Sequence, residues 1–128
     1  MTGKTAAQLV AEAKAKIENL SAEDVAAEMQ SGDVLLVDIR EPEELARTGV
    51  IAGSVHVPRG MLEFHADPTS AYHREEFDPE RRVILHCAGG GRSALAAAAL
   101  QEMGYSKVAH LNTGINGWIE SGLPTEQR

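Results

Sequence analysis

The sequence of 128 residues is poor in several residue types, and each shortage excludes a class of protein. It holds one cysteine, Cys87, which excludes an internal disulfide framework. Lys and Arg number 12 against 19 Asp and Glu, and the net charge of −7 argues against nucleic acid as a partner, since nucleic-acid binding needs a basic face. No apolar run approaches the roughly 20 residues of a membrane span, and no apolar segment near the start is typical of a signal peptide. We therefore expect a reduced thiol, a cytoplasmic location, and neither membrane nor nucleic-acid partners.

Helical and strand patterns alternate along the chain, which is typical of an α/β fold. Helices are expected over residues ~4–19, 22–31, 42–47, 60–65, ~92–103 and 115–121. Strands are expected over residues 34–37, 54–57, 83–86 and 108–111, with a polar surface excursion over ~66–82. Residues 34–37 are a continuous apolar run, which favours a strand buried on both faces. We predict a mainly parallel central sheet of about four to five strands with helices on both faces. An N-terminal helix (1–20) precedes one globular unit (21–128).

The single cysteine lies on a glycine-rich connection between an expected strand and an expected helix. Three consecutive glycines are costly to order, roughly 0.5–1 kcal/mol each relative to alanine. Arg92 in the first helical turn opposes the helix dipole. Both costs are explained if the N–H groups of this loop bind an anion. A thiol in that loop is expected to ionise easily, because its thiolate is such an anion.

Three stretches of the sequence together resemble a rhodanese-homology domain. They are Leu36–Glu44 followed by Gly49–Pro58, then Cys87–Ser93, and finally Gly114–Trp118 with Gly122–Pro124. The resemblance implies a single-domain rhodanese-like sulfurtransferase. Such an enzyme moves sulfane sulfur from thiosulfate or a persulfide donor to a thiol, to cyanide or to a protein acceptor. Sulfur would be carried as a covalent persulfide on Cys87, with no other cofactor and no metal.

The spacing within the loop bears on the alternatives. Four residues separate Cys87 from Arg92. This short loop resembles that of sulfur-transferring members, whereas the phosphatase relatives of the cell-cycle type carry one residue more. A second interpretation is a sulfur-carrier or redox-sensing interaction module with little turnover of small molecules. Cys-dependent phosphatase or arsenate reductase chemistry is a third.

The candidate site residues fall into two groups. Cys87 is the expected nucleophile, and backbone N–H groups would come from the loop residues Ala88, Gly89, Gly90, Gly91, Arg92 and Ser93. The resemblance suggests a structural role for Asp38 and Arg40, while Arg59 is either a contact for an anionic donor or a solvated surface residue. Arg92 could brace the loop or attract the donor. The histidines within strands, His110 among them, are interpreted as packed core residues.

Overall fold

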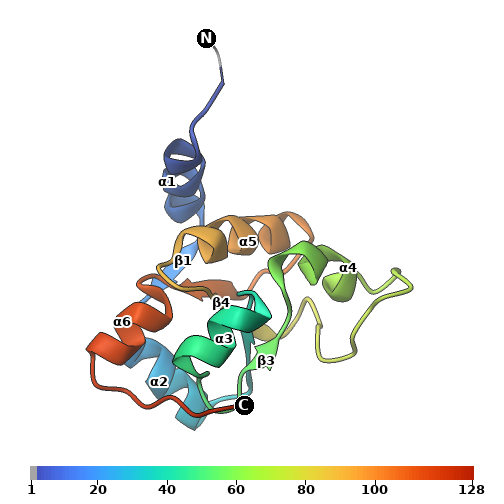
Figure 1. Ribbon diagram of the computed structural model, residues 1–128. Coiled ribbons are helices and arrows are strands. Elements are labelled where there is room, and N and C mark those ends of the chain that lie inside the picture. The colour runs from blue at the N-terminus through green and yellow to red at the C-terminus, as the bar shows by residue number, and fades with distance from the viewer. Residues whose placement is uncertain (1–2) are drawn as a thin grey trace.

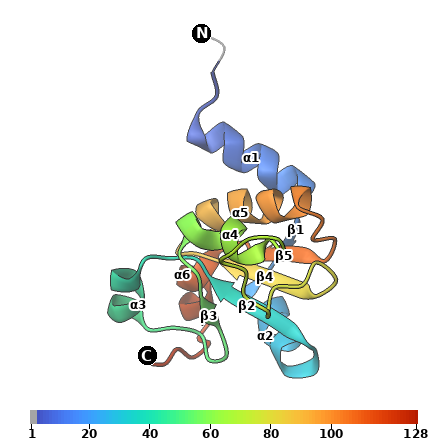
Figure 2. The same ribbon diagram turned by 90° about the vertical axis from the view of Figure 1, so that its right-hand side faces the viewer.

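Five parallel strands form the centre of the computed structural model, which describes residues 3–128 (Figures 1 and 2). They are β1 (Glu18–Leu20), β2 (Val34–Asp38), β3 (Val55–His56), β4 (Arg82–His86) and β5 (Val108–Leu111). Their order across the sheet is β1-β5-β4-β2-β3. The prediction of a parallel sheet of four to five strands is confirmed. Loops at the carboxyl ends of such strands form the usual ligand-binding edge of an α/β fold.

Helices cover both faces of this sheet. They are α1 (Ala6–Lys16), α2 (Ala22–Ser31), α3 (Pro42–Thr48), η1 (Arg59–Met61), α4 (Leu62–Ala66), α5 (Gly91–Glu102) and α6 (Gly114–Glu120). Figure 2 shows α1, α4 and α5 on one side of the sheet and α2 on the other. Successive strand residues point to opposite faces, so Val37 packs beneath α4 and α5, while Leu36 packs with α2 and α6.

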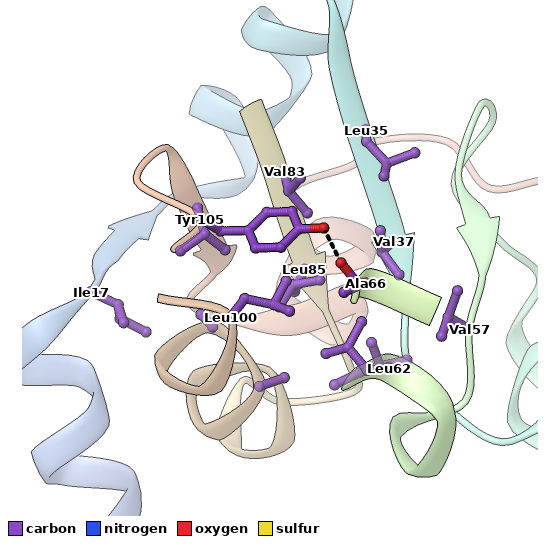
Figure 3. Close-up of a cluster of buried hydrophobic side chains, with 14 of the residues drawn as sticks. Ile17, Leu35, Val37, Val57, Leu62, Ala66, Val83, Leu85, Leu100 and Tyr105 are labelled. Carbon is purple, nitrogen blue, oxygen red and sulfur yellow. Dashed lines mark hydrogen bonds between the residues drawn. The ribbon is translucent and has the colours of Figure 1, made fainter. Parts of the chain in front are cut away.

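The expected excursion over residues 66–82 is tied into the core at two points. Phe77 is buried in the same cluster as α4 and α5. The buried Tyr105 donates a hydrogen bond to the Ala66 carbonyl oxygen at 2.7 Å (Figure 3). Burial raises the pKa of Tyr105 to about 12. These contacts hold the long connection against the core beneath α4 and α5.

The N-terminal segment differs from the sequence prediction. The expected helix over ~4–19 ends at Lys16, and Glu18–Leu20 forms an edge strand paired with β5. The Asn19 side chain donates hydrogen bonds to the carbonyls of Lys14 and Ile17 at the end of α1, so it satisfies groups that would otherwise need a further helical turn. Within residues 3–128, no helix has the length and apolar character needed to cross a membrane.

Candidate functional site

Cys87 immediately follows β4, at the carboxyl edge of the sheet. Its sulfur accepts hydrogen bonds from the backbone N–H groups of Gly90, at 3.2 Å, and Ser93, at 3.4 Å. The side chain is buried, with an exposed fraction of 1%. Among residues 3–128, nothing accepts a hydrogen bond from the backbone N–H groups of Gly89 or Gly91. The loop therefore surrounds the sulfur with donors and holds more of them ready for an anion.

The first residues of α6 pack against this loop on the side away from the sulfur. The N–H groups of Ile115 and Asn116 donate to the carbonyls of Cys87, at 2.9 Å, and Ala88, at 3.1 Å. Gly114 has φ +66°, and a Cβ there would overlap the Ala88 carbonyl oxygen. This close approach requires glycine. Because the carbonyls of Cys87 and Ala88 are bound by α6, the N–H groups of the loop remain available to the cysteine sulfur.

Arg92 and Glu44 form a bidentate ion pair between α5 and α3. Arg92 Nη1 donates to Glu44 Oε2 and Arg92 Nη2 donates to Glu44 Oε1, each at 2.9 Å. Hydrogen bonds from Arg92 lower the pKa of Glu44 to about 2, and the same pair raises the pKa of Arg92. The Arg92 side chain is 41% exposed and that of Glu44 18%. Arg92 is thus held at the outer side of the loop.

Asp38 and Arg40 form a fully buried pair after β2. Arg40 donates to both carboxylate oxygens of Asp38, at 2.8 and 3.0 Å, and also to Thr48 and to the carbonyl of Gly49. Burial raises the pKa of Asp38, but the hydrogen bonds from Arg40 together with the charges of His86 and Arg40 more than offset this effect, so the net shift is downward. The pair ties the end of β2 to α3 and does not contact Cys87.

Arg59 follows β3, and its backbone N–H donates to the carbonyl of Ile39, which lies between Asp38 and Arg40 in the sequence. It belongs to η1 and forms an ion pair with Glu63 at 2.7 Å. Arg59 Nη1 is thus paired, and no side-chain hydrogen bond or ion pair within residues 3–128 joins Arg59 to Cys87 or its loop.

Ser93 connects the cysteine to a buried histidine. Its hydroxyl oxygen is 3.6 Å from Cys87 Sγ and 2.8 Å from His110 Nδ1, and His110 Nε2 is 2.7 Å from Asn19 Oδ1. Burial, reinforced by the Lys14 ammonium, lowers the pKa of His110 to about 4. His110 is therefore neutral at pH 7.

A second histidine, His86, precedes Cys87 but lies in different surroundings. It is fully buried, and neither ring nitrogen has a hydrogen-bond partner within residues 3–128. Its Nε2 lies 3.8 Å from Asp38. Burial lowers its pKa, despite the opposing effect of Asp38. His86 faces the α2 side of the sheet and is separate from the sulfur.

Sequence reasoning does not identify two residues of this site, Glu44 and Asn19, or the polar contacts made by His110. Glu44 lies in the first of the three stretches, four residues after Arg40, and its charge could have suggested a partner for Arg92. Asn19 falls within the helix expected over ~4–19, an expectation that gives no indication of its position beside β5. The expected burial of His110 is confirmed, but its polar partners are not visible in the sequence.

These features define a class of protein: a parallel α/β domain that presents a single cysteine in a glycine-rich, N–H-lined loop. The family follows from comparison with known proteins. A model described as rhodanese-like domain matches residues 21–121, and the chain belongs to the rhodanese family.

Similar proteins carry related descriptions. A sulfurtransferase of Allochromatium vinosum is 37% identical over 92 residues, covering 72% of this chain and 78% of that protein. The thiosulfate sulfurtransferase GlpE of Glaesserella parasuis is 31% identical over 108 residues, covering 77% of this chain and 82% of that protein. A structure from Rhodopseudomonas palustris, described as a protein of unknown function and possible tyrosine phosphatase, is 41% identical with a TM-score of 0.93. The match covers 98% of this chain and 97% of that chain. The comparisons support rhodanese-like sulfur transfer.

Proposed function

We propose that the protein moves sulfane sulfur from thiosulfate or a persulfide donor to a thiol or cyanide acceptor through a persulfide on Cys87. The observation that carries the proposal is the set of backbone N–H donors around the sulfur of Cys87. Cys87 Sγ accepts two backbone N–H bonds, and further N–H groups of the same short loop have no acceptor among residues 3–128. A negatively charged sulfur is the group that such a set of donors stabilises.

The transfer consists of two displacements. In the first, the Cys87 thiolate attacks the outer sulfur of thiosulfate, an S–S bond forms to Cys87, and the S–S bond of the donor breaks. Its electron pair leaves on sulfite. In the second, the acceptor attacks the outer sulfur of the persulfide, and the electron pair of that S–S bond returns to Cys87. With cyanide the product is thiocyanate. Splitting the transfer into two steps is the advantage of a covalent nucleophile.

The surrounding residues would have distinct roles in this reaction. Ala88, Gly89, Gly90, Gly91, Arg92 and Ser93 would supply the N–H groups that hold the outer sulfur. Asp38 and Arg40 would brace the end of β2, because their bonds are made to each other and to α3. Cys87 is only 1% exposed, which favours a donor that presents its sulfur at a narrow end.

The test combines intact mass with turnover. We expect the reduced wild-type protein to gain the mass of one sulfur atom after thiosulfate treatment, and to release it as thiocyanate when cyanide is added. Cys87→Ser and Cys87→Ala should neither gain sulfur nor turn over, because the nucleophile is absent. Sulfur transfer retained in either variant would rule out Cys87 as the nucleophile. A persulfide that forms but reacts only with a protein acceptor would identify a sulfur carrier.

Phosphatase chemistry is a second candidate, because one similar structure is described as a possible tyrosine phosphatase. Only four residues separate Cys87 from Arg92, and Arg92 is held by Glu44, so the guanidinium is not turned into the loop. Hydrolysis of an aryl phosphate provides the comparison. Turnover that matches the rate of sulfur transfer, and is lost in Cys87→Ser, would favour the phosphatase.

A further inference from the structure

The Ser93 hydroxyl lies between the sulfur of Cys87 and the imidazole of His110, and it can point its one proton at only one of them. The oxygen is 3.6 Å from Cys87 Sγ and 2.8 Å from His110 Nδ1. Both Ser93 and His110 are fully buried, so no bulk water competes for these bonds. The direction of the hydrogen bond to His110 therefore decides whether Ser93 offers the sulfur a proton or a lone pair.

Asn19 determines that direction from the opposite side of the ring. Its Nδ2 donates to the carbonyls of Lys14, at 3.0 Å, and Ile17, at 3.2 Å, which leaves Oδ1 facing His110. A carbonyl oxygen only accepts, so His110 Nε2 must carry the ring proton. In a neutral ring Nδ1 is then an acceptor, and the Ser93 hydroxyl donates to it.

The charges around this chain of hydrogen bonds keep the ring neutral. The Lys14 ammonium on α1 acts on His110, and the guanidinium of Arg92, paired with Glu44, lies on the cysteine side. Burial also favours the neutral imidazole. A positive His110 would carry protons on both nitrogens and would reverse the bond to Ser93, so its neutrality is part of the arrangement.

We propose that Asn19 and His110 are positioning residues that turn the Ser93 hydroxyl proton away from Cys87. Ser93 then accepts a hydrogen bond from the thiol and donates none to the thiolate. The thiolate keeps only backbone N–H donors and remains more nucleophilic than one that also binds a hydroxyl proton. The inference rests on the proposed use of Cys87 as the nucleophile. It also gives the segment before residue 21, outside the family match, a part in the site.

Alkylation of Cys87 by iodoacetamide across pH tests this proposal without any sulfur donor or acceptor. In His110→Phe the Ser93 hydroxyl is free to donate to the thiolate. We expect the pH midpoint of alkylation to fall by roughly one unit, and the limiting rate at high pH to fall with it. In a Ser93→Ala background, His110→Phe should produce no further shift. An unchanged midpoint, or the same shift with and without the Ser93 hydroxyl, would overturn the proposal.

Two further measurements guard against a variant that merely disturbs the core. Asn19 is exposed, so Asn19→Ala should fold and shift the midpoint in the same direction by less, because both tautomers of His110 become accessible. Lys16→Ala, an exposed change on the same segment, should leave it unchanged. Long-range 1H–15N spectra of the wild type should show a proton on Nε2 and none on Nδ1. The opposite tautomer would contradict the proposal, whatever the protein's activity on thiosulfate.

Discussion

At the scale of single residues, the role of Arg92 can be separated into bracing and binding. Its bidentate pair with Glu44 joins α5 to α3 and fixes the outer side of the cysteine loop. A guanidinium occupied in this way contributes through the position of the loop more than through direct contact with an anionic donor. The two roles predict different kinetics for variants of the pair.

We predict that Glu44→Gln and Arg92→Met each slow sulfur transfer by about tenfold, chiefly in kcat, because the loop loses its brace. The double variant should be no slower than the slower single variant, since both changes remove one interaction. Steady-state kinetics with thiosulfate provide the measurement. If the KM for thiosulfate rises much more in Arg92→Met than in Glu44→Gln, Arg92 binds the donor directly and the bracing role is wrong.

At the scale of secondary-structure elements, the turn into α6 holds the cysteine loop in shape. Gly114 combines a positive φ with a close approach to the Ala88 carbonyl, while Gly122 has φ +81° and open space around it. We predict that Gly122→Ala costs about 1 kcal/mol of unfolding free energy, from backbone strain alone. Gly114→Ala should cost about 3 kcal/mol or more, because the new methyl group also displaces the loop.

Urea unfolding of both glycine variants measures these costs, and persulfide formation provides a second measurement. Gly114→Ala should form the persulfide poorly even where it is fully folded, while Gly122→Ala should behave as wild type. Equal costs for the two variants would show that the contact with Ala88 is unimportant, and that strain at positive φ explains both.

The elements also show where sequence reasoning succeeds and where it ends. The apolar runs at 34–37 and 83–86 have no competing pattern, and both form the expected strands. Residues 18–20 carry only one buried apolar side chain, Leu20, so nothing local distinguishes an edge strand from the end of a helix. Their conformation depends on pairing with β5, far away in the chain. The cysteine loop was recognisable because its residue types are unusual, whereas the Glu44 and Asn19 contacts are tertiary.

At the scale of the whole molecule, the sheet separates two buried histidines from one another. His110 lies on the side of α1 and α5, and His86 on the side of α2 and α6, so each is enclosed by a different apolar cluster. Burial lowers the pKa of both, with that of His110 reaching about 4. The free energy of unfolding therefore depends on pH through one buried histidine on each face of the sheet.

We predict that this arrangement makes the protein lose stability in mild acid. Each histidine has a lower pKa when folded than its unfolded value of about 6.5, so below that pH the unfolded chain binds more protons and unfolding is favoured. The melting temperature should fall as the pH drops from about 6.5 to about 4. Carboxylates with lowered pKa values, Asp38 and Glu44, add a further loss only below about 4.5.

Thermal unfolding followed by circular dichroism between pH 7.5 and pH 4 checks this expectation. His110→Phe removes one of the two titrating groups, so its melting temperature should fall less steeply over this interval. Gly122→Ala is the matched control: it is destabilised without any change in titration, and should keep the wild-type slope at a lower melting temperature. A wild-type curve that is flat down to pH 4.5 would mean that neither buried histidine resists protonation in the folded protein.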